Sequence, residues 1–459
     1  MKIKSNVVAI YAIIIVCVVS ILIYISLMYY TKHNIINWAG NSSREFNEMY
    51  KPTNIHELTA TMKSLQPQTP IIIIGGNHSW APSKYYWGTN TESLTETPVC
   101  LNLIDFKGEL SYDETSSVVT CLAGTPLGEL LHFLAKNKRS LATYPNSPFI
   151  SVGGMVATCS HGAALAVGSV SELVTDMQYI LPGDDKPRSV PNELLGAYAS
   201  SLGQLGVVCT VSLKTIPISW FKRDITNVKR GEFIQNMKNS IKRSELLRVF
   251  WTPETDMCEV QEYVRLPNTT NDVISLYPCK IDNHFMVYQS QDLVTDINYA
   301  PELDTQFGLS NPPLSLKNVT GYGHCQKQFE CPQNVPTLLE AEYAVSIEHL
   351  KDALDVIKSW IDKYNPIRIG TIYIRFCGGD SLPWISPVKG SGPFAWIIVD
   401  IDYTHMPDHF SMFTILQNEL WSKVRARPHM GKWNNTDPKR FVEMYGDDGV
   451  KFLELAKNI

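Results

Sequence analysis

The feature that most constrains this chain is an uncharged, strongly apolar run near its N-terminus, from Val7 to Tyr30. At a helical rise of 1.5 Å per residue this run is about 36 Å long, enough to cross a bilayer with some tilt. It is longer than the apolar core of a cleavable signal peptide, and it ends in two tyrosines rather than in a small-residue cleavage site. We therefore expect one uncleaved transmembrane signal anchor at residues 7–30.

The charges flanking this run predict its orientation. Lys2 and Lys4 precede it and Lys32 follows it, so the positive-inside bias leaves residues 1–6 in the cytoplasm. The rest of a single-pass protein then lies in a lumen or outside the cell, where glycans and disulfides can form. Acceptor sequons stand at Asn41, Asn268, Asn318 and Asn434. Of ten cysteines only Cys17 lies within the span, and the pairs to test first are Cys258 with Cys279 and Cys325 with Cys331.

Composition and motif spacing argue against two kinds of function, nucleic-acid binding and metal binding. The 459 residues carry 40 Lys+Arg against 45 Asp+Glu, a net charge of −5. No basic run stands out to follow a phosphate backbone, so nucleic acid is not an expected partner. No Cys-x-x-Cys or His-Glu-x-x-His spacing occurs, so a metal site is not indicated.

Short apolar runs alternate with helical patterns after the span, which indicates a mixed α+β fold. The runs at residues 70–74 and 118–122 predict buried strands, and the alternation at residues 209–213 predicts a half-buried one. Thr125-Pro126 is typical of a helix N-cap and first position, before leucines spaced along one helical face. A second amphipathic helix is expected from Ser346 to Tyr364. The internal domain boundary is predicted between Pro217 and Asp224.

Two glycine-bearing segments carry the chemistry. Gly75-Gly76-Asn77-His78-Ser79 directly follows the isoleucine strand at residues 71–74. Glycine lets backbone N–H groups approach an anion such as a diphosphate, and asparagine enters positive φ more readily than most residues. A tight turn with a polar histidine is the alternative. The segment from Ser151 to Gly162 places two glycine turns among small residues, so something must lie close against its backbone.

These segments occur in a series of motifs that resembles the vanillyl-alcohol-oxidase-type, or PCMH-type, FAD-linked oxidases. Within that group the chain is most similar to alditol oxidase, L-gulonolactone oxidase and D-arabinono-1,4-lactone oxidase. The resemblance covers about residues 37 to 445. Besides the glycine segments it includes the motifs at residues 37–41, 50–53, 205–208, 342–345, 374–376, 384–387 and 426–432.

The resemblance implies an FAD-binding domain of two α+β lobes at residues 37–217 and an α+β cap and substrate domain at residues 224–459. It implies that the backbone around Gly75 and Gly76 holds the diphosphate of FAD. The residues that it assigns to the cofactor are Gly75, Gly76, Asn77, His78, Ser79, Pro145, Gly153, Gly154, Thr158, Ser160, His161, Gly162 and Val207. His78 stands where related oxidases join an imidazole nitrogen to the flavin, so a covalent flavin is expected; a noncovalent loop histidine is the alternative.

By the same resemblance, Arg375 and Lys432 are the cations beside the flavin, and fixed positive charge there would stabilise a developing alkoxide and the reduced flavin. Two other positions depart from the family pattern. Tyr373 replaces a glutamate that usually precedes the arginine by two residues, and Asn146 replaces a substrate-contacting serine. An active-site histidine of alditol oxidase falls near Trp396 or Ile397, neither of which transfers a proton.

The resulting hypothesis is a membrane-anchored, FAD-dependent oxidase that acts on a CH–OH group of a polyol or aldonolactone and passes electrons to O2, giving hydrogen peroxide. One alternative is a dehydrogenase with another acceptor, because Pro145 stands at the position thought to control oxygen access. The other is a glycosylated binding ectodomain on the same fold, which the absent glutamate and histidine favour.

Overall fold

The computed structural model describes residues 33–37, 43–79, 98–147, 149–217, 221–265, 338–366, 371–402 and 408–458. The predicted membrane span at residues 7–30 lies outside these ranges, as do Cys279, Cys325 and Cys331. Within the described ranges, no helix is both long and apolar enough to cross a bilayer.

The first lobe is built around a small parallel sheet. Its strand order is β3 (Met49–Tyr50), β5 (Val99–Asn102) and β4 (Ile71–Ile74), and β1 (His33–Ile36) and β2 (Ser43–Phe46) form a separate antiparallel pair. Helix α2 (Ile55–Ser64) begins at Asn54, whose side chain accepts a hydrogen bond from the Glu57 N–H at 3.0 Å. Its buried Leu58 and Met62 pack in one apolar cluster with the central strand β5.

The second lobe is an antiparallel sheet with short helices. Its strand order is β10 (Arg188–Ser189), β9 (Val174–Ile180), β11 (Val207–Lys214), β7 (Val118–Leu122) and β6 (Ser111–Asp113). A further pair joins β8 (Arg139–Ser140) to β12 (Ile216–Pro217). The helical segments of this lobe are α3 (Leu127–Lys136), α4 (Val152–Ala157), η2 (Val170–Leu173), η3 (Asn192–Leu194) and α5 (Leu195–Tyr198).

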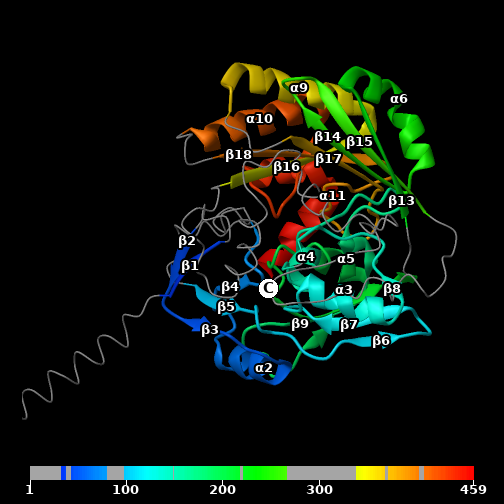
Figure 1. Cartoon of the computed structure of the whole chain (residues 1–459). Coiled ribbons are helices and arrows are strands. Elements are labelled where there is room, and N and C mark those ends of the chain that lie inside the picture. The colour runs from blue at the N-terminus through cyan, green and yellow to red at the C-terminus, as the bar shows by residue number, and fades with distance from the viewer. Residues whose placement is uncertain are drawn as a thin grey trace, which may run out of the picture.

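The third unit is a seven-stranded antiparallel sheet. Its order is β13 (Phe221–Lys229), β15 (Met257–Arg265), β14 (Leu246–Thr252), β17 (Ile372–Cys377), β18 (Phe394–Asp402), β16 (Leu338–Ser346) and β19 (Arg427–Pro428). Helices α6 (Arg230–Arg243), α9 (Leu350–Tyr364) and α10 (His409–Val424) cover the sheet face that points away from the two lobes (Figure 1). The short η5 (Ile347–His349) leads into α9.

The two faces of this sheet differ because side chains alternate along each strand. Val249, Trp251, Ile374 and Tyr343 belong to the apolar core beneath the helices. Their neighbours in sequence therefore point to the opposite face, toward the lobes. Helix α11 (Pro438–Lys457) returns to the lobes, where its Phe441 and Phe452 join the apolar core of the second lobe.

Most of the elements predicted from the sequence are present, with differences at their ends. Strands β4 and β7 and the strand around Cys209 form as predicted, although β11 is more deeply buried than a half-buried strand. Helix α3 is capped by Pro126, which has no side chain to donate or accept, rather than by Thr125. The helix predicted from Ser346 starts as the 3-10 turn η5 before the α-helix begins at Leu350.

The structure describes two residues for which the sequence predicted a modification, the glycan acceptor Asn434 and the disulfide candidate Cys258. Asn434 is 5% exposed, and its side-chain amide donates to the Lys432 carbonyl at 3.1 Å. In the folded protein the Asn434 side chain is thus held against the backbone with little exposed area, and glycosylation at this sequon stays a prediction. Cys258 is a free thiol that is fully buried in the core beneath the cap helices.

Candidate functional site

The first glycine-bearing segment follows strand β4 as a turn. Asn77 adopts φ of 55°, in the left-handed region that asparagine enters more readily than most residues. A Cβ atom on Gly75 would lie 2.1 Å from Ser151 Oγ, and one on Gly76 would lie 2.4 Å from the Phe149 carbonyl oxygen. The turn therefore packs directly against the start of the second glycine-bearing segment.

The second segment forms the short helix α4 rather than a strand. Ser151 caps it by accepting from the Gly154 N–H at 3.4 Å, and a Cβ on Gly153 would lie 2.8 Å from the Ala123 Cβ. The sequence indicated that something lies close to this backbone. At both glycines the close neighbour is the protein itself. Gly76 allows the two glycine-bearing segments to approach each other, and Gly153 allows α4 to pack against Ala123.

The cap domain meets the first segment through residues 431–432. Ser79 Oγ lies 3.4 Å from the Gly431 carbonyl oxygen, although the two residues are 352 positions apart. Part of the His78 side chain reaches the surface, but its ring is crowded by surrounding protein atoms, and this desolvation, with a smaller effect of the Lys432 charge, lowers its pKa to about 3. Lys432 itself forms an ion pair with Glu340. The structure thus brings the predicted flavin-linking histidine and the predicted lysine into one neighbourhood.

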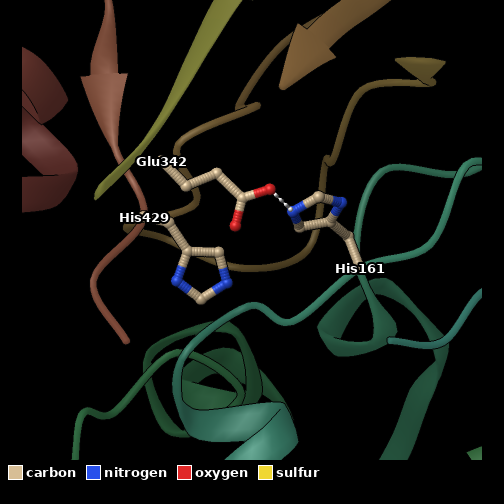
Figure 2. Close-up of side chains that lie close together, drawn as sticks. All are labelled: His161, Glu342 and His429. Atoms are coloured by element: carbon tan, nitrogen blue, oxygen red, sulfur yellow. Dashed lines mark ion pairs between the residues drawn. The ribbon is translucent and has the colours of Figure 1, made fainter. Parts of the chain in front are cut away.

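A buried polar cluster lies where the cap sheet faces the second lobe. Glu342, on β16, accepts from Arg375 Nη2 at 2.6 Å, and its same carboxylate oxygen lies 3.1 Å from His161 Nε2. Figure 2 shows His161, Glu342 and His429 converging, with the carboxylate directed at the His161 ring. Arg375 Nη1 also donates to the His161 carbonyl at 3.3 Å. The cluster therefore joins the cap to the glycine-bearing segment of the second lobe.

The charges of this cluster follow from its burial. Burial alone would raise the pKa of Glu342, but the charge of Arg375 and the contact with His161 outweigh it and hold this pKa well below its ordinary value. Burial lowers the pKa of His429 to about 3, with Glu342 opposing the effect. Burial and the charge of Arg375 also lower the pKa of His161. At neutral pH the cluster is an ionised Glu342–Arg375 pair beside two neutral imidazoles.

The side chains of His161, Glu342 and His429 have the composition of a metal site. Their nearest ligand atoms lie within 4.8 Å of one another. However, Glu342 already accepts from Arg375, and His429 Nδ1 accepts from the Gly431 N–H at 2.9 Å. A guanidinium on the carboxylate repels a cation, so this arrangement favours a hydrogen-bonded network over metal binding.

A small cavity of about 10 Å³ lies beside Arg375. Its lining residues are Tyr144, Asn146, Gly162, Ala163, Leu246, Arg248, Tyr373 and Arg375. Three predicted substrate-side residues, Asn146, Tyr373 and Arg375, therefore meet at one place. A more open hollow lined by Trp421, Arg425, Arg427, Glu443 and Met444 shares no residue with this pocket.

Other predicted residues are placed around these features. Gly162 lines the pocket, and its N–H donates to Thr143 Oγ1 at 2.9 Å. Thr158 Oγ1 and Ser160 Oγ lie 3.2 Å apart, and a Cβ on Gly431 would lie 3.3 Å from the Thr158 Cβ. Pro145 is buried next to Asn146. Val207, by contrast, lies in the apolar core of the first lobe, outside the lining of the pocket.

Sequence reasoning missed several residues of the site. Glu342 and His429 stand inside motifs that were recognised, but no role was expected for them. Arg248 was missed altogether, although a single charge between Leu247 and Val249 in an apolar strand is a signal of a buried charge. Trp396, which stands near the expected histidine, stacks on His161 with ring centroids 4.0 Å apart. It contributes an aromatic face near the position where the resemblance places the active-site histidine of alditol oxidase.

Comparison with known proteins now identifies the class. Residues 48–186 match the profile of an FAD-binding domain. The overall structure resembles cholesterol oxidase from Brevibacterium sterolicum with a TM-score of 0.61 at 16% identity, covering 93% of this chain and 96% of that one. The fold is thus the PCMH-type FAD-binding fold with an α+β cap, and the cofactor is FAD.

The comparisons also identify the family to which the chain belongs within this fold. Residues 211–459 match the profile of D-arabinono-1,4-lactone oxidase, and the chain belongs to this family of FAD-dependent oxidoreductases. L-gulonolactone oxidase of Scyliorhinus torazame is 22% identical over 89% of this chain and 91% of its own length. Alditol oxidase of a Streptomyces species is 22% identical over 87% of this chain and 89% of its own. D-arabinono-1,4-lactone oxidase of Candida albicans is 26% identical, but the match spans 48% of this chain and 41% of that protein.

Proposed function

We propose that this protein is an FAD-dependent oxidase that converts a CH–OH group of a polyol or aldonolactone to a carbonyl, with O2 as the electron acceptor and hydrogen peroxide as the product. The observation that carries the proposal is the meeting of His78 with Lys432. The sequence predicted these residues separately, one as the flavin attachment and one as a cation beside the flavin. In the folded chain the turn that holds His78 lies against the segment that holds Lys432, with Ser79 Oγ 3.4 Å from the Gly431 carbonyl oxygen.

The residues present fit a flavin between the lobes and the cap. The pocket beside Arg375 contains polar atoms that no other described residue satisfies, namely the Tyr373 hydroxyl and Arg375 Nε. Buried polar atoms without partners point to a ligand that completes them. The turn after β4 places Asn77 in the left-handed conformation, which is one component of the backbone concavities that bind anions. When bound, FAD supplies the acceptor for the two electrons that leave the substrate carbon.

The chain's own side chains supply charge and orientation. Arg375 and Lys432 provide fixed positive charge that stabilises an alkoxide forming on the substrate. Glu342 holds the guanidinium of Arg375 through its 2.6 Å contact, and the same carboxylate oxygen lies 3.1 Å from His161 Nε2. His78 is neutral at physiological pH because its pKa is about 3, and a neutral imidazole nitrogen is the form that can bond to the flavin.

We further propose that residues 7–30 anchor the protein in a membrane, with residues 1–6 in the cytoplasm and the FAD-binding and cap domains in a lumen or outside the cell. The uncharged run and its flanking lysines support this arrangement. Protease protection of the full chain in sealed microsomes tests it. Digestion of the large domain without permeabilisation would overturn the orientation.

The covalent attachment is tested by expressing the full chain in a secretory host and precipitating it with acid. Wild-type protein should be yellow, and the colour should stay with the precipitated polypeptide. His78→Ala should release the flavin into the supernatant, whereas His56→Ala, at an exposed position on α2, should not. Colour that remains with the His78→Ala polypeptide would refute the linkage through His78.

The choice of electron acceptor is tested on the same preparation. Polyols and lactones are mixed anaerobically with the yellow protein while the flavin absorbance is followed, and air is then admitted. Rapid recovery of the absorbance with hydrogen peroxide formation is the expected result. Slow recovery in air with fast recovery by a quinone would instead identify a dehydrogenase, which the buried Pro145 beside the pocket favours. A folded but colourless protein would support the binding-ectodomain alternative, which Trp396 in place of a proton-transfer residue favours.

A further inference from the structure

Two further carboxylates lie opposite each other on the lobe-facing side of the cap sheet. Glu340 on β16 and Asp400 on β18 are cross-strand partners in the antiparallel register. Their neighbours in sequence, including Ala341 and Val399, belong to the apolar core beneath the helices, so both carboxylates point to the other face. Directly opposite residues of antiparallel strands have Cβ atoms about 4.5–5.5 Å apart, and like charges there repel. Ionising both carboxylates is therefore unfavourable.

The segment that follows β19 holds Lys432 beside this pair. The Trp433 N–H donates to the Glu340 carbonyl oxygen at 2.9 Å, and the His429 N–H donates to the Glu342 carbonyl oxygen at 2.8 Å. The Lys432 ammonium forms an ion pair with the Glu340 carboxylate, and these two side chains are only 21% and 13% exposed. Lys432 is therefore held against the cap sheet rather than extended into solvent.

Asp400 is the member of the pair that holds a proton. Its Oδ1 atom is buried and has no hydrogen-bond partner among the described residues. Burial, and next the charge of Glu340, hold the pKa of Asp400 well above its ordinary value. Glu342 on β16 acts in the same direction, and Lys432 and Arg375 oppose the shift. The carboxylate pair thus carries one proton and one negative charge, which the charge of Lys432 matches.

The position of this pair bears on a group that the site lacks. Oxidation of an alcohol releases the hydroxyl proton, and Tyr373 stands where the resemblance places a glutamate. Tyr373 on β17 is the cross-strand partner of Ile398 on β18, and Asp400 is the next residue along β18 on the same face. Glu340 lies one strand further, because β16 follows β18 in the sheet order. The two carboxylates therefore stand one and two strands away from the position of the absent glutamate.

From this geometry we propose that Glu340 and Asp400 share one proton and accept the hydroxyl proton of the substrate through Lys432. This role rests on the oxidase function proposed above. The substrate O–H bond breaks as its proton passes to Lys432 Nζ, and Lys432 gives a proton to the Glu340 carboxylate. The C–H hydrogen leaves with two electrons for FAD, and a C=O bond forms. Lys432 remains an ammonium, and Glu340 becomes neutral and later returns its proton to solvent. Glu340 and Asp400 are thus positioning residues that act through Lys432.

The shared proton is tested first, without substrate, on the full-length protein with FAD bound. A protonated carboxyl group has an infrared C=O stretching band that an ionised carboxylate lacks, and difference spectra between wild type and each variant at pH 7 isolate it. Glu340→Gln and Asp400→Asn should each remove this band, although each variant keeps one carboxyl group of the pair. The remaining carboxyl group ionises because it then lies near Lys432 with no carboxylate directly opposite.

Two further variants make this measurement specific. Glu340→Asp keeps both carboxyl groups and should keep the band. Glu262→Gln removes another buried carboxylate of the cap sheet, which is paired with Arg243, and should also keep the band. A band that survives in Glu340→Gln or in Asp400→Asn would overturn the shared proton.

Turnover is tested next by stopped-flow reduction of the flavin with polyols and lactones. Glu340→Gln should lower kcat by at least about 100-fold with a much smaller change in KM, because the acceptor of the proton is lost. Glu340→Asp should recover part of the rate, and Glu262→Gln should react like wild type. A wild-type kcat in Glu340→Gln would overturn the relay. If no polyol or lactone reduces the flavin of the wild-type protein, the proposed function is rejected, and the infrared band still decides whether the pair shares a proton.

Discussion

The two walls of the site are built in different ways. On the lobe side, Gly75, Gly76 and Gly153 allow backbone segments to approach each other so closely that a single added methyl group would collide. On the cap side, the wall consists of long charged and aromatic side chains, including Arg248 and Arg375 on the adjacent strands β14 and β17 and Glu342 on β16.

This difference shows where each wall is sensitive to change. The lobe wall depends on the absence of side chains, so an added atom should damage it through steric overlap. The cap wall depends on matched charges in a buried place, so the loss of one partner should damage it through an unpaired charge. The predictions that follow test this contrast, beginning with the largest expected effect.

Removing the charge of Glu342 should cause the largest loss. Glu342→Gln leaves the buried Arg375 guanidinium without its ionised partner, so the free energy of unfolding should fall by about 3–5 kcal/mol. The matched control is Glu245→Gln, which removes the exposed partner of Arg265 and should cost at most about 1 kcal/mol. Urea denaturation of both variants measures the difference. Equal losses would show that the cap wall does not depend on a buried charge pair.

An added methyl group on the lobe wall should have the next largest effect. In Gly76→Ala the new Cβ meets the Phe149 carbonyl oxygen, which belongs to the backbone, so unfolding should become easier by about 1–3 kcal/mol. FAD retention should fall as well. In Gly231→Ala, at the start of α6, the new Cβ meets nothing within 4 Å and stability should not fall. Wild-type stability and flavin content in Gly76→Ala would contradict the proposed steric role.

The buried His429 should make stability depend on pH. Its folded-state pKa of about 3 lies below the value of about 6.5 in an unfolded chain, so the unfolded state gains a proton first as the pH falls. The free energy of unfolding therefore decreases from about pH 6.5 toward pH 3. His429→Asn, which keeps an acceptor for the Gly431 N–H, should reduce this slope by about 1.4 kcal/mol per pH unit. Urea titrations between pH 4.5 and 7 measure it, and an unchanged slope would contradict a neutral buried imidazole.

Loss of one aromatic ring on the cap wall should have the smallest effect on stability. Phe250→Leu removes the stack on Tyr373, a pair worth about 0.5–1.5 kcal/mol beyond its buried area. Because Tyr373 lines the pocket, KM for the substrate should rise. The binding free energy lost, calculated from the ratio of the KM values, should exceed the loss in the free energy of unfolding. Stopped-flow flavin reduction together with urea denaturation separates the two effects. A large loss of stability with an unchanged KM would place this ring pair in the core rather than at the site.

The parts of the fold that were predictable from sequence are those specified by contiguous residues. The isoleucine run of β4, the amphipathic pattern of α3 and the positive φ of Asn77 all depend on neighbours within a few positions. The family motifs allowed further residues to be predicted, because each motif is a short contiguous string. They located Arg375 and Lys432. They did not assign a role to Glu342, because a glutamate in an apolar strand has no local feature that names its partner.

The sequence by itself determined that the chain folds into α+β lobes and an α+β cap, that glycine turns follow particular strands, and that FAD is the cofactor. Only the tertiary structure decided which charged side chains meet. Arg248, Glu342 and Arg375 come from three strands, and His161 comes from the second lobe. Their contacts depend on strand order and register, because a shift by one residue would turn each side chain into the apolar core. Register is set by the packing of the whole sheet against its helices, and no short stretch of sequence contains that information.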